Sequence, residues 1–179
     1  FLTGTDEHGQ KVETAATDKG VTPQAFTDSV SQNFRDLTSR MNFSNDDFIR
    51  TTEARHRAAC QKLWSILLER GQITIGSYAG WYAVRDEAFY TETEIVDGKA
   101  PTGAPVEWVE EPSYFFNLSQ WQGPLLEFYE ANPDFVGPAS RFNEVKSFVI
   151  GGLRDLSVSR ASFSWGVPVP DNDAHVMYV

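Results

Sequence analysis

Asp6, Glu7 and His8 place three ionisable side chains in a row near the start of the chain, directly before a glycine. The residues ahead of them, Phe1-Leu2-Thr3, form a short apolar run that is typical of a β-strand. In α/β proteins, ligands bind in a crevice at the carboxyl ends of parallel strands, which is where these side chains would lie. The residues alone therefore predict a carboxylate at the ligand-binding edge of an α/β fold.

Two other interpretations of these side chains stay open at this point. Asp6 could cap a helix that starts near Gly9, with His8 as an ordinary loop residue. A metal site on Asp6 and His8 has less support, because the other histidines, His56 and His175, show no ligand spacing between them. The sequence contains no Gly-rich dinucleotide motif, no P-loop and no Gly-x-Ser-x-Gly motif.

The composition predicts a folded protein in a reducing compartment. The 179 residues are 41% hydrophobic and 13% aromatic, enough for the core of one domain, or of one domain with a sizeable insertion. The single cysteine, Cys60, excludes an internal disulfide framework and a Cys-rich zinc site. No apolar run approaches the roughly 20 residues that span a bilayer, and no secretory signal is visible. We therefore expect a cytoplasmic protein with no membrane partner.

The charge of the chain limits its partners further. Lys and Arg number 15 against 25 Asp and Glu, which gives a formal net charge of −10. Because nucleic-acid phosphates bind to positive potential, we expect no DNA binding and poor non-specific RNA binding. A role with RNA would need a restricted basic patch or residues outside this chain.

Strands and helices are expected to alternate in the first part of the chain. Apolar periodicity and the Thr22-Pro23 start signal predict strands over 1–3 and 48–52, and helices over 9–19, 22–41 and 53–70. Two helical faces are predicted to be buried, one with Phe26, Val30, Phe34, Leu37 and Met41 and one with Cys60, Leu63, Trp64 and Leu67. This order predicts an α/β fold with a doubly wound parallel sheet.

The second part of the chain has a different character. Closely spaced aromatic residues predict antiparallel hairpins over 73–95, followed by an extended segment over 106–118, helices over 121–131 and 138–153, and a strand over 176–179. Trp64, Trp81 and Trp121 fit core positions better than a base-stacking surface.

The stretch FLTGTDEHGQK resembles the segment that follows the first helix of the catalytic domain in class I methionyl-tRNA synthetases. Six further blocks resemble the same family in the same order: FIRTTE at 48–53, GWY at 80–82, EPSYFFNLS at 111–119, DLSVSR at 155–160, WGVPVP at 165–170 and MYV at 177–179. Sister synthetases for leucine, isoleucine and valine share the TDEHG-type block and stay an alternative. The short spacing of the later blocks favours methionine, since it leaves no room for a large editing insertion.

The resemblance implies a Rossmann-like class I synthetase fold with an inserted α+β connective-peptide domain. Residues 1–72 and 161–179 would belong to the catalytic domain and residues 73–160 to the insertion. The HIGH-type and KMSKS-type segments of the family, which handle the phosphates of ATP, have no match in this sequence. We therefore expect an internal piece of a longer enzyme that does not activate methionine by itself. A non-catalytic synthetase-like scaffold is the alternative from another class of function.

The resemblance also implies a reaction and a set of site residues. In the full-length enzyme, ATP with magnesium activates L-methionine to methionyl-adenylate, and the methionyl group passes to tRNA(Met). Asp6 matches the carboxylate that binds the α-ammonium of methionine, and Arg160, the catalytic candidate, would support Asp6 from behind. The residues expected on the pocket side are His8, Met177, Tyr178 and Val179. A salt bridge for Arg160, and plain core packing for Tyr178 and Val179, remain open.

Two further expectations concern metal and helix residues. Many family members carry Cys-x-x-Cys after the aromatic hairpin, whereas this chain has Ala83 and Asp86 at those positions. A structural zinc normally needs four N or S ligands, so we expect no zinc and a segment held by aromatic packing and hairpin pairing. Glu53, His56 and Arg57 also match the family, and we expect them to be structural.

Overall fold

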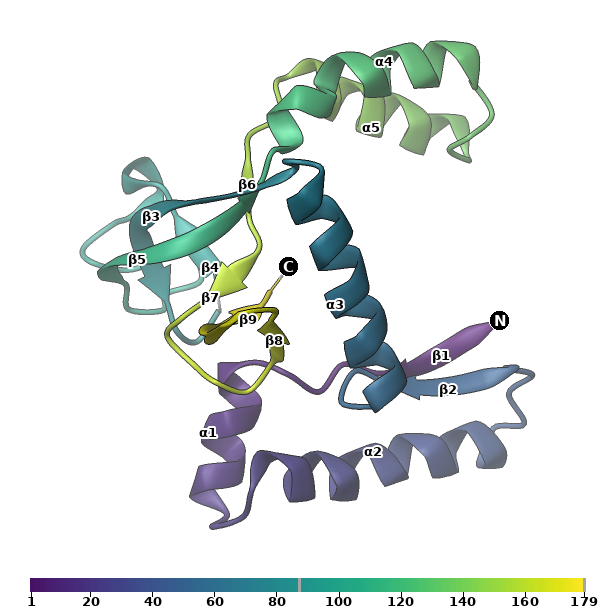
Figure 1. The fold of residues 1–179 in the computed structure, drawn as a ribbon, viewed down its shortest axis with the longest axis vertical. Helices are drawn as coiled ribbons and strands as arrows, with labels where there is room; N and C mark the ends of the chain where they lie inside the picture. Colours follow the sequence, from purple (N-terminus) through teal and green to yellow (C-terminus); the bar gives the residue numbers. More distant parts are fainter. Residues whose placement is uncertain (87, 179) are drawn as a thin grey trace.

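The computed structural model describes residues 1–86 and 88–178, apart from the side chain of Tyr78. Two helices and a small parallel sheet lie at one end of the molecule, antiparallel strands lie beside a long helix in the middle, and a helical hairpin lies at the other end (Figure 1). The predicted α/β class is confirmed, with a parallel sheet that has two strands.

The parallel sheet fixes where the ionisable cluster lies. Its elements are, in chain order, β1 (Leu2–Thr5), α1 (Gln10–Asp18), α2 (Pro23–Arg40) and β2 (Asp47–Arg50). The two helices form the crossover between β1 and β2, which pair in parallel over their whole length. Parallel pairing puts the carboxyl ends of both strands at one edge, and the side chains of Asp6 and Thr51 meet there.

The apolar stripe predicted to be buried on α2 is largely exposed. The exposed fractions are 36% for Val30, 50% for Phe34, 43% for Leu37 and 60% for Met41. The buried residues of this helix are Thr27 and Ser31. Helix α2 has 18 residues, whereas the two elements that it chiefly contacts, α1 and β1, have 9 and 4, so they are too short to cover the stripe. The prediction is wrong for these four side chains.

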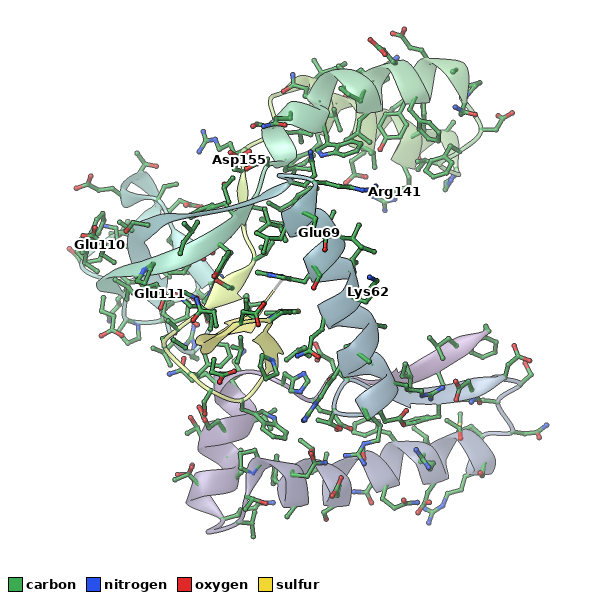
Figure 2. All side chains as sticks on the ribbon, viewed as in Figure 1. Lys62, Glu69, Glu110, Glu111, Arg141 and Asp155 are labelled. Carbon is green, nitrogen blue, oxygen red and sulfur yellow. The ribbon has the colours of Figure 1, made fainter. Side chains whose placement is uncertain are left out.

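Helix α3 (Ala54–Glu69) follows β2 and runs through the centre of the molecule (Figure 1). The main core cluster consists of Trp64, Ile73, Val158 and Val169, with Leu67 half-buried against it. Leu63 is 57% exposed, so its predicted inward position is wrong. A helix turns about 100° per residue, which places Leu63 on the flank of the Trp64 face. Lys62 points away from the strands altogether (Figure 2).

The aromatic hairpins predicted over 73–95 are confirmed as part of an antiparallel sheet of order β4-β3-β5-β6. Its strands are β3 (Ile73–Ala83), β4 (Ala88–Tyr90), β5 (Glu107–Phe116) and β6 (Leu156–Ser157). Trp81 and Trp108 lie opposite each other on β3 and β5 with their ring centroids 5.5 Å apart. Trp108 is 58% exposed and Trp81 half-buried, so this pair covers a sheet surface and Trp81 is not a core residue.

The helical hairpin extends from the far end of this sheet (Figure 1). It contains α4 (Gln122–Ala131) and α5 (Ala139–Ile150). Two short 3-10 helices lie earlier in the chain: η1 (Glu92–Glu94), and η2 (Leu118–Trp121) directly before α4. Trp121 is 41% exposed and donates to Gln72, which corrects its predicted core position. Asp155, labelled in Figure 2, closes the base of the hairpin by accepting hydrogen bonds from the amide and hydroxyl of Ser119.

A third sheet returns the chain to the parallel strands. It has the order β7-β9-β8, with β7 (Ser159–Arg160), β8 (Val167–Val169) and β9 (Asn172–Met177). This sheet lies between α1, α3 and the central antiparallel sheet (Figure 1). It therefore brings residues from the end of the sequence next to those at its start. Among the described helices, none is long and apolar enough to cross a membrane.

Candidate functional site

A pocket of about 380 Å³ opens where the parallel strands, α3 and the third sheet meet. Its lining comprises Asp6, His8, Gly9, Thr51, His56, Cys60, Phe163, Val167, Met177 and Tyr178. The structure thus brings together Asp6, His8, Met177 and Tyr178, which the sequence places at opposite ends of the chain. Val179, the other predicted pocket residue, lies outside the described residues. The pocket combines one carboxylate and two imidazoles with an apolar wall.

Glu7, to which the sequence analysis gave no role, anchors the loop that carries Asp6 and His8. Its buried carboxylate accepts two hydrogen bonds from Arg50, at 2.7 and 2.9 Å. The hydroxyls of Thr5 and Thr52 donate to it at 2.6 and 2.5 Å. Burial raises the pKa of Glu7, but the hydrogen bonds from Arg50, Thr5 and Thr52 outweigh burial and leave the pKa below its ordinary value. Glu7 is therefore an ionised anchor.

The anchoring of Glu7 explains why its neighbours reach the pocket. Side chains alternate along an extended segment, so when Glu7 points inward, Asp6 and His8 point to the other side. The hydroxyl of Thr51 lies 3.4 Å from Asp6 Oδ1 and accepts the Glu7 amide at 2.9 Å. Gly9, with φ of 103°, then turns the chain into α1, and no side chain caps this helix. The alternative that Asp6 caps the helix is therefore wrong.

His8 lies in the pocket wall with an uncharged imidazole favoured. Its Nε2 atom is buried and has no hydrogen-bond partner among the described residues. Burial, followed by the positive charge of Arg57, lowers the pKa of His8, while Asp6 opposes this shift. The ring packs edge-on against Trp165 with centroids 5.5 Å apart. An imidazole in this position contributes polarity without adding a positive charge.

His56 and Cys60 extend the pocket along α3. They stand one turn apart on this helix, and the Cys60 sulfur lies 3.7 Å from His56 Nδ1. Burial raises the pKa of the Cys60 thiol, so the thiol stays protonated and apolar in character. His56, which we expect to be structural, lies in the pocket wall. The sequence carries a signal for this position, because α3 begins three residues after Thr51 and its first turns must lie near the strand edge.

Arg160 is buried behind the pocket wall. Its NH1 atom donates to Ser157 Oγ at 2.8 Å and to the Ser159 carbonyl at 2.7 Å. Its guanidinium lies 4.3 Å from the ring centroid of Tyr178, which lines the pocket. Among the described residues, no ion pair joins Arg160 to Asp6. The support of Asp6 by Arg160 stays a prediction, and the contact that the structure shows for the guanidinium is with the Tyr178 ring.

The segment of residues 83–104, where we expect no zinc, has its own polar cluster. The Asp86 carboxylate accepts hydrogen bonds from Tyr90 at 3.0 Å, from Arg85 at 3.1 Å and from Thr102. Ala83 is fully buried against two other alanines. Within residues 1–86 and 88–178, no three His, Cys, Asp or Glu side chains are grouped to hold a metal ion.

Comparisons with known proteins agree on one family. The family model described as tRNA synthetases class I (M) matches residues 1–106 and 102–179. A methionine–tRNA ligase of Rickettsia typhi is 67% identical over 100% of this chain and 36% of its own length. A methionine–tRNA ligase of Mesorhizobium japonicum is 55% identical, again over 100% of this chain and 36% of its own.

Solved structures give the same result. The Mycobacterium tuberculosis methionyl-tRNA synthetase bound by methionyl-adenylate is 51% identical with a TM-score of 0.89, over 99% of this chain and 36% of that one. The apo form of the same synthetase is 50% identical with a TM-score of 0.72, over 87% of this chain and 32% of that one. The chain thus spans about a third of the length of the relatives it matches.

Proposed function

We propose that this chain, which belongs to the class I tRNA synthetases (M), forms the amino-acid-binding part of a methionine–tRNA ligase. The observation that carries this proposal is the pocket itself, in which the Asp6 carboxylate shares a cavity with Phe163, Val167 and Met177. A carboxylate suits the α-ammonium of a free amino acid, and the apolar wall suits an unbranched thioether side chain.

The reaction we propose has two steps. The methionine carboxylate attacks the α-phosphorus of ATP, which yields methionyl-adenylate and releases pyrophosphate. The 3′-terminal hydroxyl of tRNA(Met) then takes the methionyl group, and AMP leaves. The mycobacterial relative, which was solved with methionyl-adenylate, carries the product of the first step. Catalysis of this kind depends mainly on the position of the reactants, and this chain would position the amino acid.

Asp6, His8 and Tyr178 have distinct parts in this proposal. Asp6 binds the α-ammonium and thereby fixes the direction of the attacking carboxylate. His8 lines the same space, and its lowered pKa keeps a second positive charge away from the ammonium. Tyr178 closes the pocket wall, held from behind by the guanidinium of Arg160. Val179 is proposed to continue this wall.

The remaining partners follow from the proposed reaction. Magnesium would accompany ATP, and because the described residues offer no group of three His, Cys, Asp or Glu side chains, the phosphates themselves would be its main ligands. The tRNA is proposed as the acceptor of the second step. We also propose a cytoplasmic location, which suits the free thiol of Cys60.

The test is methionine-dependent exchange of pyrophosphate into ATP by a full-length protein that carries this sequence. We expect exchange with L-methionine and none above background with leucine, isoleucine or valine at equal concentration. Exchange with one of those three in place of methionine would assign the protein to a sister synthetase. No exchange with any amino acid would overturn the proposal and favour a non-catalytic binding module.

A further inference from the structure

We propose that Trp165 is a positioning residue for the amino-acid site, an inference that rests on the proposed function. Trp165 does not line the pocket. It lies in the segment before β8 and bonds the backbone of the loop that carries Asp6 and His8, whereas Arg50 bonds the Glu7 carboxylate. Its effect on the substrate would therefore pass through that loop.

Two hydrogen bonds join Trp165 to the residues on either side of His8. The indole Nε1–H donates to the carbonyl of Glu7 at 2.6 Å, and the amide of Gly9 donates to the carbonyl of Trp165 at 3.0 Å. These atoms belong to the two peptide groups that flank His8, so the bonds fix both peptide planes around this residue. The edge-on contact between the His8 and Trp165 rings, with an interplanar angle of 65°, fixes the side chain as well.

Trp165 is itself held in place by neighbours outside residues 5–9, which we call the pocket loop. A Cβ atom added at Gly166 would lie 2.6 Å from the Cβ of Val176, so the backbone here packs directly on β9. The hydroxyl of Ser164 donates to Glu13 on α1 at 2.8 Å. The guanidinium of Arg57 lies 6.0 Å from the Trp165 ring centroid. A group held on a rigid support can transmit its position to the residues that it contacts.

The loop is thus clamped between two rigid partners that act on different atoms. Arg50 and Thr52 hold the carboxylate of Glu7, whereas Trp165 holds the Glu7 carbonyl and the Gly9 amide. Loss of the indole donor would leave the Glu7 carboxylate in place but free the peptide group beside His8. We therefore expect a shift at Asp6 and His8 with little effect on the rest of the fold. Small displacements of this kind weaken the hold on the substrate.

The test substitutes Trp165→Phe in a full-length ligase that carries this sequence, with Trp121→Phe as the matched control. Phenylalanine keeps an aromatic ring but removes the indole N–H donor. In the control, Trp121→Phe, the hydrogen bond lost is the one to Gln72 at 2.8 Å, and neither of these residues lines the pocket. We expect Trp165→Phe to raise the KM for methionine roughly three- to tenfold, as the loss of one hydrogen bond predicts. The KM for ATP should stay unchanged. Trp121→Phe should change neither constant.

A second measurement reports on the loop without any activity. Hydrogen exchange of the peptide that contains Gly9 should be faster in Trp165→Phe than in the parent and unchanged in Trp121→Phe. An unchanged KM for methionine, or an equal rise in the KM for ATP, would overturn the inference while leaving the proposed function intact. If the parent protein shows no methionine-dependent exchange of pyrophosphate into ATP, the proposed function is overturned and this inference with it. This holds whatever the rate of hydrogen exchange at Gly9.

Discussion

Two segments of this molecule, each organised around one carboxylate, differ in the sequence separation and the burial of the hydrogen bonds that hold them. The loop of residues 5–9 is anchored by Glu7, whose partners Arg50 and Thr52 stand 43 and 45 positions away and whose side chain is almost fully buried. The segment of residues 83–104, which includes β4 and η1, is tied by Asp86, whose partners Arg85, Tyr90 and Thr102 are 1, 4 and 16 positions away.

The two kinds of contact differ in what their loss would cost. A buried ion pair has high cost when one partner is lost, and it specifies one geometry strongly. Hydrogen bonds between near neighbours at the surface are easily replaced by water, so they shape a loop without fixing the rest of the fold. Long-range, buried polar contacts thus hold residues 5–9, whereas contacts between closer neighbours hold residues 83–104. The predictions below test this contrast, from the largest expected effect to the smallest.

Removal of the cation at the pocket loop should have the largest effect on stability. The substitution Arg50→Leu leaves the Glu7 carboxylate buried and without its charged partner, which predicts a loss of about 3–5 kcal/mol in the free energy of unfolding. Urea unfolding at pH 7 would measure this loss. Arg55→Leu is the matched control, because Arg55 pairs with Asp47 and Glu53 at the surface, and its loss should change stability far less. Equal losses for both variants would show that the buried pair of Arg50 and Glu7 stabilises the fold no more than a surface pair does.

Removal of the charge that faces the substrate should act on binding and leave stability nearly unchanged. Asp6→Asn keeps the shape of the side chain but would lose the proposed charge-assisted contact to the methionine ammonium, which predicts a roughly 10- to 150-fold higher KM for methionine. Initial rates of pyrophosphate exchange in the full-length enzyme would measure this. Asp134→Asn removes the same charge from the exposed tip of the helical hairpin and should leave the KM unchanged. A KM for Asp6→Asn within twofold of the parent value would exclude ammonium binding by Asp6.

Local sequence signals predicted the elements of the fold and part of the site. Periodicity identified α2 and α3, and the strand end before Asp6 and His8 identified the ligand edge. Burial along α2 was not predictable in this way, because it depends on which elements are long enough to cover the helix. The contact between Trp165 and the Glu7 carbonyl joins residues 158 positions apart, and no local pattern encodes such a pair.

The pH dependence of stability should also follow from the pocket loop. The pKa of His8 lies below its ordinary 6.5 and that of Glu7 below its ordinary 4.5, so in each case the unfolded chain binds protons first as the pH falls. Stability should therefore decrease below pH 6.5 and decrease further below pH 4.5. The second decrease should be smaller than the loss in Arg50→Leu, because protonated Glu7 can still accept hydrogen bonds.

Urea unfolding from pH 8 to pH 3 would test this assignment. His8→Gln should flatten the first decrease and Glu7→Gln the second, whatever their stability at pH 7. If the free energy of unfolding falls with pH in both variants as it does in the parent, other groups control the loss of stability in acid. Titration of His8 and Glu7 would then not explain it.

The segment of residues 83–104 should respond least, both to substitution and to metal removal. Asp86→Ala deletes the acceptor shared by Tyr90 and Thr102, but its neighbours can turn to water, and buried Ala83 and Ala104 keep their packing. We therefore expect a melting temperature lowered by no more than about 3 °C. Because hydrogen bonds and hairpin pairing hold this segment, we also expect EDTA to leave the melting temperature unchanged and the purified protein to contain no stoichiometric zinc. Thr93→Ala, a nearby surface substitution, serves as the control. A loss of stability in Asp86→Ala as large as that in Arg50→Leu would show that residues 83–104 depend on their carboxylate as strongly as residues 5–9 do. A melting temperature that drops with EDTA and recovers with zinc would show that a metal holds this segment.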